Sequence, residues 1–257
     1  MAAGDITAKR GKASDFKGAV FDGVDDYVII TSGQPDINTS FSITANIIRL
    51  KKMGSTIFTS RDRSDGNEGI FFKLDTVLEL HKSGVTVIGQ STSNVTEGEW
   101  TNVGVSYDGT TVKFYINGAP AGTTARAATF THGNFMIGDR NSVAADNPIK
   151  GFINNLKFHN RILTDQEFLD ISNNKYISNN KLIAHWKLQD DYKDSVGAAD
   201  GTNNGTYLTN TIPNRLMADT EELNLAAVTD KIIALPRTER DGQFTIVGAN
   251  REAWKFL

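Results

Sequence analysis

Short runs in which apolar and polar residues alternate dominate the first 160 residues of the chain. The run GAVFDGVDDYVII at residues 18–30 shows the pattern, interrupted by three aspartates around Gly23. A repeat of two residues predicts half-buried β-strands, and turn-forming Gly, Asn and Asp residues separate the runs. Comparable runs follow at FSITANIIRL (41–50), STIFTSR (55–61), GIFFKLD (69–75), TVLELHK (76–82), GVTVIGQ (84–90), FMIGDR (135–140) and GFINNLKFHNRI (151–162).

Two β-hairpins are predicted within EWTNVGVSYDGTTVKFYINGAPAGT at residues 99–123. Asp108-Gly109 and Asn117-Gly118 separate alternating runs, and such pairs are the strongest local signals for a tight reversal. A helix is predicted only at LTDQEFLDISNN (163–174), where Thr164 is the expected N-cap and Glu167 completes a capping box. Many short strands without β-α-β alternation predict an all-β antiparallel β-sandwich of the jelly-roll type.

Composition and charge exclude several classes of protein. The chain has 27 Lys and Arg residues against 30 Asp and Glu, a net charge of −3, which argues against binding to nucleic acid. No run reaches the roughly 18 apolar residues of a membrane span. Cysteine is absent, so the fold has neither disulfides nor thiolate metal sites. The first residues carry no apolar segment of the kind a secretory signal needs, so we expect synthesis in the cytoplasm without export.

Four of these segments resemble the laminin-G-like, concanavalin A-like lectin/glucanase jelly-roll domains. KGAVFDGVDDYV resembles the opening strand, FSITANI the second strand, residues 99–123 the central hairpin, and FMIGDR with GFINNLKFHNRILTDQEFLDI the closing strand and helix. Together they span residues 17–171. The resemblance implies the fold and no particular ligand.

A circular permutation is predicted from residues 182–208, LIAHWKLQDDYKDSVGAADGTNNGTYL. This stretch resembles the segment that normally comes first in the family, and Leu182–Leu188 would supply the strand missing from residues 1–16. A second, truncated copy of the domain and a strand donated to a neighbouring subunit are the alternatives. The expected organisation is an N-terminal arm (1–16), a sandwich (17–208) and a C-terminal extension (209–257).

The aspartates of the opening run allow three interpretations: a turn, a cation site, or the lip of a binding face. Asp beside Gly23 is ordinary turn chemistry. Calcium takes oxygen ligands that distant loops can supply. The resemblance implies a structural calcium between two loops, and extends it to Asp25, Asp26, Asp194 and Asn203.

Catalysis is not expected. Glycosidases need two carboxylates flanking the scissile bond, and the sequence has no alternating Glu-x-Asp-x-Glu array. The four histidines show no metal-binding spacing. Trp100 and Trp186 are expected to pack in the core rather than to stack on sugars.

The C-terminal extension contains two strand-like pieces, KIIALP (231–236) and QFTIVGA (243–249), and ends in Trp254, Phe256 and Leu257. An apolar terminus usually covers a surface, which here is either the flank of its own domain or a partner; in the second case these three residues are the expected partner interface.

Two functions are compatible with the sequence. The first is a non-catalytic structural protein of a virion, a capsid decoration or a fibre or tail component of a bacteriophage. It would sit in the virion, contact other virion proteins or copies of itself through its arm and extension, and display a lectin-like sandwich to glycans. The alternative is a free carbohydrate-binding module or a bacterial adhesin.

Overall fold

A computed structural model describes residues 17–37, 39–50, 54–61, 68–82 and 86–209, together with the backbone of two strands at 244–247 and 253–256. The chain divides into a large unit, residues 1–212, and a small one, residues 213–257. Each unit is described by itself. Within the described residues, no helix is long and apolar enough to cross a membrane.

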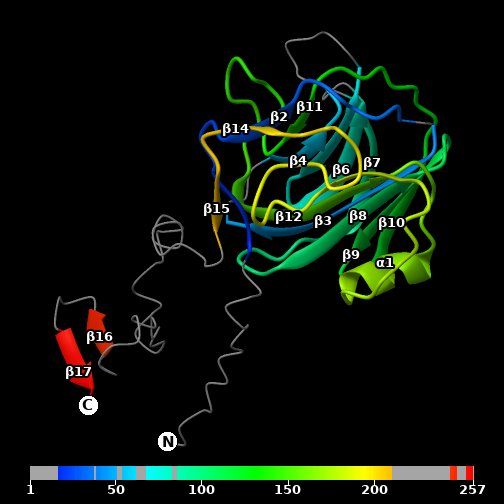
Figure 1. Cartoon of the computed structure of the whole chain (residues 1–257). Coiled ribbons are helices and arrows are strands. Elements are labelled where there is room, and N and C mark those ends of the chain that lie inside the picture. The colour runs from blue at the N-terminus through cyan, green and yellow to red at the C-terminus, as the bar shows by residue number, and fades with distance from the viewer. Residues whose placement is uncertain are drawn as a thin grey trace, which may run out of the picture. The chain divides into compact units, whose positions relative to one another are not determined.

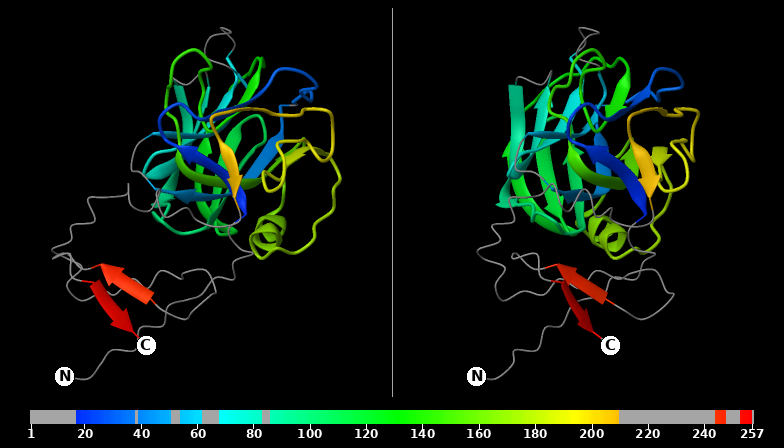
Figure 2. Two further views of the ribbon diagram at one scale, coloured as in Figure 1. Left: turned by 60° about the vertical axis from the view of Figure 1, so that its left-hand side comes forward. Right: turned by 90° about the vertical axis from the view of Figure 1, so that its left-hand side faces the viewer.

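The large unit is an antiparallel β-sandwich, with two sheets packed face to face (Figure 1, Figure 2). Among the described residues, the first sheet has eight strands in the order β10-β9-β8-β3-β12-β1-β15, with β13 also paired to β12. Their bounds are β1 (Gly18–Asp22), β3 (Phe41–Arg49), β8 (Thr101–Tyr107), β9 (Thr111–Ile116), β10 (Ala119–Ala125), β12 (Lys150–His159), β13 (Leu182–Trp186) and β15 (Tyr207–Thr209). The predicted all-β sandwich is confirmed.

The second sheet has seven strands in its described part, in the order β14-β2-β11-β4-β5-β6-β7. Their bounds are β2 (Tyr27–Ile30), β4 (Ser55–Thr59), β5 (Ile70–Leu74), β6 (Val77–Lys82), β7 (Thr86–Asn94), β11 (Phe135–Ile137) and β14 (Thr202–Asn204). The loop at residues 138–149 contacts the outer face of this sheet: the Arg140 guanidinium lies 4.9 Å from the Phe71 ring, and the Thr56 hydroxyl donates to the Asn147 carbonyl. A part of this outer face is therefore covered.

The core lies between the two sheets, as the alternating pattern requires. Its aromatic side chains pack edge to face and offset: Phe58 lies 5.6 Å from Phe158 and 6.1 Å from Trp186, measured between ring centroids. Trp186 has no exposed surface, and its indole N–H donates to the carbonyl of Ala199 at 2.7 Å. The expectation that Trp186 packs in the core is confirmed.

The opening run GAVFDGVDDYVII forms two strands rather than one. β1 belongs to the eight-stranded sheet and β2 to the seven-stranded sheet, so the aspartate-rich residues between them carry the chain from one sheet to the other. Gly23 makes this possible, because its φ is +80° and a Cβ there would lie 2.6 Å from the Cβ of Lys150.

The predicted hairpins and helix are present. β8, β9 and β10 pair in sequence, and both residues of the Asn117-Gly118 turn have positive φ, as a tight hairpin turn requires. Helix α1 (Asp165–Ser172) begins at the predicted N-cap, Thr164, with the capping box formed. α1 packs on the outer face of the eight-stranded sheet, where Phe168 stacks 3.6 Å from the ring of Tyr115.

Residues 182–209 return to the sandwich after α1. β13 pairs with the second half of β12, β14 pairs with β2, and β15 pairs with β1. β1 and β13 share one edge of β12: β1 takes Lys150–Ile153 and β13 takes Leu156–His159. Without β13, half of that edge would present unpaired backbone groups, which strongly favours pairing.

The small unit contains β16 (Phe244–Val247) and β17 (Ala253–Phe256), which pair antiparallel. The predicted strand within QFTIVGA corresponds to β16. The predicted strand KIIALP lies outside the described residues, and so does the N-terminal arm.

Candidate functional site

A row of three asparagines crosses the middle of the eight-stranded sheet. Asn102 on β8, Asn46 on β3 and Asn154 on β12 are direct register partners, so their side chains lie on one face of adjacent strands. The Asn102 amide donates to the Asn46 carboxamide oxygen at 2.8 Å, and the Asn46 amide donates to Asn154 at 2.9 Å. The Asn154 amide in turn donates to the backbone carbonyl of Lys17. We call these three residues the asparagine row.

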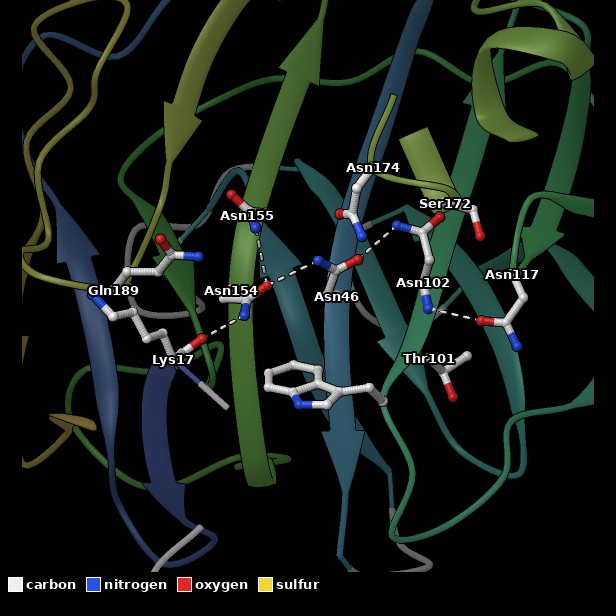
Figure 3. A pocket seen from close by; sticks show the side chains of 11 residues that line it. Lys17, Asn46, Thr101, Asn102, Asn117, Asn154, Asn155, Ser172, Asn174 and Gln189 are labelled. Carbon is white, nitrogen blue, oxygen red and sulfur yellow. Dashed lines mark hydrogen bonds between the residues drawn. The ribbon is translucent and has the colours of Figure 1, made fainter. Parts of the chain in front are cut away.

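The row points away from the core. Its neighbours along β3, Ala45 and Ile47, belong to the hydrophobic core, and side chains alternate between the two faces of a strand. On this outer face, the row lies beside α1 and lines the floor of a hollow, with Asn102 and Asn154 largely buried (Figure 3).

The hollow measures about 330 Å³, within the range of roughly 300–1,000 Å³ typical of small-molecule sites. The row is surrounded by Thr101, the Asn117-Gly118 hairpin turn, the end of α1 and the segment after β13. The remaining lining residues are Lys17, Trp100, Thr101, Asn117, Asn155, Ser172, Asn174 and Gln189. Carboxamide groups therefore dominate this hollow, which we call the asparagine pocket.

Trp100 lies in this pocket, so the expectation that it packs in the core is wrong. Its ring lies 6.2 Å from that of Phe152, centroid to centroid, in an edge-to-face arrangement. A Cβ at Gly18 would lie 3.4 Å from its Cη2 atom. The indole therefore extends over the outer face of β12 and β1, half-buried beside the row.

Two polar atoms of the pocket residues, both buried, have no hydrogen-bond partner among the described residues: the indole Nε1 of Trp100 and the Oδ1 of Asn102. Asn102 is only 8% exposed. Leaving such a group unpaired typically costs about 1–3 kcal/mol. Buried unpaired atoms also occur outside the pocket, at Thr44 and His159 for example, so they do not by themselves mark a binding site.

The aspartates between β1 and β2 form a second candidate site. Among the described residues, oxygens of Asp22, Asp25 and Asp26 lie within 4.8 Å of one another, close enough to hold a metal ion such as calcium. The same residues also make turn bonds: Asp22 accepts the N–H of Val24 at 2.7 Å, and Asp26 accepts that of Asp22 at 2.8 Å. None of the three lines the asparagine pocket.

The other two predicted calcium ligands, Asp194 and Asn203, accept hydrogen bonds from β13 and from their own loop. Asp194 Oδ1 accepts the backbone N–H groups of His185 and Val196. The Asn203 carboxamide oxygen accepts the hydroxyl of Thr206. The close acidic cluster in the described chain contains Asp22 in place of Asp194, and the full set Asp25, Asp26, Asp194 and Asn203 stays a prediction.

Burial raises the pKa of Asp26 from its usual 3.8 to about 6, an effect that the hydrogen bond from Asp22 only partly offsets. The unfolded chain therefore loses this proton at a lower pH than the folded chain. Consequently, Asp26 makes the folded state less stable as the pH rises from about 4 to about 6, and the cost persists at neutral pH.

We expect Asp26→Asn to raise the free energy of unfolding at pH 7 by about 1–2 kcal/mol in EDTA, after allowance for solvent screening. The gain should largely disappear at about pH 3, where the carboxyl group is mostly protonated in both states. Urea unfolding at the two pH values measures this, with Asp25→Asn at an exposed neighbouring position as the control. Equal stability of Asp26→Asn and the natural chain at both pH values would contradict it.

Added calcium tests the metal site in the same proteins. If the cluster binds the ion, calcium raises the melting temperature of the natural chain and has little effect on Asp26→Asn. An identical shift in both proteins, or none in either, would contradict a calcium site at this cluster.

A second hollow of about 620 Å³ lies between the loop at residues 31–37 and residues 132–135. The His132 Nδ1 atom lies 2.7 Å from the hydroxyl oxygen of Ser60, within hydrogen-bond distance, a pairing also seen in hydrolases. Ser60, however, is fully buried and also accepts the N–H of Ile70, which marks the pairing as structural. This hollow lacks the register-matched polar row of the first.

The predicted partner interface falls at the C-terminus. Trp254 and Phe256 belong to β17, where the backbone pairs them with Ile246 and Phe244. Leu257 lies outside the described residues. The interface stays a prediction.

Comparison with known proteins assigns the family. The profile of the Laminin_G_3 family, described as concanavalin A-like lectin/glucanases superfamily, matches residues 22–168, more than half of the chain. The chain therefore belongs to this family. No curated protein matches the chain in sequence.

Solved structures share the fold at low sequence identity. A candidate carbohydrate-binding protein of Bacteroides ovatus has a TM-score of 0.62 at 16% identity; the match covers 77% of this chain and 61% of that one. A heptameric SAP-like pentraxin of Limulus polyphemus has a TM-score of 0.56 at 16% identity, over 79% of this chain and 98% of that one. The CBM40 domain of a Ruminococcus gnavus sialidase, solved with α2,3-sialyllactose, has a TM-score of 0.51 at 13% identity, over 61% and 96%.

Proposed function

We propose that the chain is a non-catalytic carbohydrate-binding domain and that the asparagine pocket holds the glycan. The observation that carries the proposal is the register of Asn102, Asn46 and Asn154 across three adjacent strands, with Trp100 beside them. Family membership and the carbohydrate-binding descriptions of two similar structures support it.

The chemistry of the pocket suits a sugar. A carboxamide offers both donors and an acceptor, as a hydroxyl group does, so a row of them can bond neighbouring hydroxyls of one ring. An indole offers a flat apolar surface to the C–H face of a sugar and an N–H at its edge. Each asparagine is already oriented by its neighbour, so little side-chain entropy is lost on binding.

The residues that line the two hollows support binding without catalysis. Glycoside hydrolysis needs two carboxyl groups on either side of the scissile bond. Among the described residues, no aspartate or glutamate lines the asparagine pocket. Asp36 is the one acidic residue in the described lining of the second hollow.

The circular permutation belongs to the same proposal. The family profile ends at residue 168, yet the later strands β13, β14 and β15 complete both sheets. A relocated first segment accounts for this arrangement, since the termini of compact domains usually lie close together.

The role in a virion, the location there and the contacts with other virion proteins stay predictions from the sequence. None of the three structures described above is a virion protein by its description. The alternative function, a free carbohydrate-binding module, therefore has the stronger support.

A glycan array probed with the full chain tests the proposed function. We expect binding to at least one glycan, confirmed by calorimetry in solution. The second hollow supplies the control variant, because Gln34→Ala alters that hollow only. Absence of binding to any glycan, or loss of binding in Gln34→Ala, would contradict the assignment of the site.

A further inference from the structure

We propose that the asparagine pocket takes an uncharged sugar residue and binds it without a metal ion. This inference rests on the proposed function and names the class of ligand. It depends on the small net charge that the pocket presents to a ligand, and three separate features support this.

First, the described lining of the pocket lacks the carboxylate ligands that usually hold calcium or magnesium in proteins. No carboxylate lines it in the described part of the chain. The metal-binding candidates Asp22, Asp25 and Asp26 are absent from its lining. Hard cations generally need at least one carboxylate in a protein site, so a sugar held through a bound calcium is not expected here.

Second, the charge of the one cationic side chain in the lining is offset. The Lys17 Nζ lies 3.4 Å from an Asp190 carboxylate oxygen, and both groups are exposed. A carboxylate or sulfate on a sugar would have to compete with Asp190 for this ammonium group. The fork of arginine donors that suits acidic sugars is missing as well, because no arginine lines the pocket among the described residues.

Third, α1 presents its C-terminal end to the pocket. Ser172, the last residue of the helix, and Asn174 just beyond it line the hollow (Figure 3). The last carbonyl groups of a helix carry a partial negative charge, and α1 has no basic residue in its last turn. This end of the helix disfavours an anion and accommodates hydroxyl donors.

The polar groups that remain match hydroxyls rather than charges. Asparagine side chains bond neutral donors and acceptors equally well, while each supplies no net charge. A ligand rich in hydroxyl groups uses both capacities, whereas an anion uses donors only and leaves the carboxamide oxygens facing it. The balance of the pocket therefore favours a neutral sugar.

A pair of variants at the rim distinguishes a neutral ligand from a charged one. Gln189 lines the pocket and is only partly buried, so Gln189→Glu and Gln189→Lys place opposite charges at one position without disturbing a sheet. The probes are the neutral oligosaccharides bound on the array and, at matched length, oligosaccharides carrying uronic acid, sialic acid or sulfate. Affinity is measured by calorimetry with the full chain, in EDTA and in excess calcium.

For a neutral sugar, the two variants should have dissociation constants within about twofold of each other, and EDTA should leave the affinity unchanged. For an anionic sugar, the lysine variant would bind about tenfold or more tightly relative to the glutamate variant, and the difference would shrink with salt. That result would overturn the inference but leave sugar binding in place. Loss of binding in EDTA would overturn its metal-free part, and absence of binding to every oligosaccharide would overturn the proposed function with it.

Discussion

Replacing Trp186 with alanine is expected to lower the free energy of unfolding by about 3–5 kcal/mol, the usual cost of removing a large buried aromatic side chain. Trp186 has no exposed surface and stacks on Phe58. Its removal also leaves the Ala199 carbonyl without its indole donor. The residue lies on β13, so this effect tests whether the segment after α1 is part of the sandwich. Urea unfolding measures this loss of stability, followed by the circular dichroism of the backbone because the variant lacks a tryptophan.

Two further variants make the result specific. Tyr176→Ala, between α1 and β13, changes a side chain that is 83% exposed and should cost less than about 0.5 kcal/mol. Trp186→Phe retains most of the buried apolar surface and should cost less than the alanine variant. A Trp186→Ala chain as stable as the natural one would show that β13 does not complete the core.

Replacing Trp100 with alanine is expected to weaken glycan binding at least about tenfold, corresponding to about 1.4 kcal/mol or more. The indole provides the apolar surface of the asparagine pocket. Calorimetry with the neutral oligosaccharide found on the array measures the change.

Trp100→Phe is the conservative partner of this variant. It keeps a smaller aromatic surface, so it should retain a part of the affinity that the alanine variant loses. Because Trp100 also packs against Phe152, the unfolding free energy of both variants is measured alongside. Unchanged affinity in Trp100→Ala, with the fold intact, would place the glycan elsewhere.

Local sequence signals predicted the elements of this fold. The Asn117-Gly118 turn and the Thr164 cap depend on interactions within four residues, and both are present as predicted. In the run at residues 18–30, the aspartates around Gly23 indicate a turn, but the sequence does not show that this turn carries the chain from one sheet to the other. The sheet membership of β1 and β2 and the positive φ of Gly23 show it.

The asparagine pocket could not be predicted in the same way. Asn46, Asn102 and Asn154 are about fifty residues apart in sequence, and the pairing register of three strands brings them together. Register depends on the whole sandwich, which local patterns do not specify. The position of Trp100 was missed for a related reason: it directly precedes β8, so strand alternation does not determine which face it covers.

The aspartates show an intermediate case. Asp22, Asp25 and Asp26 are near neighbours in sequence, so their proximity was foreseeable. The high pKa of Asp26 was not, because it arises from burial after the later strand β14 has paired with β2. A Cβ at Gly205, beyond that strand, would clash with the Asp26 carboxylate.

The most direct test of the account is to titrate isotopically labelled protein with the bound neutral oligosaccharide and follow side-chain amide and indole signals by nuclear magnetic resonance. If the asparagine pocket holds the glycan, the carboxamide signals of Asn46, Asn102 and Asn154 and the indole signal of Trp100 shift together, along one saturation curve. Shifts confined to the second hollow, at Gln34 and His132, or to the aspartates between β1 and β2, would contradict it.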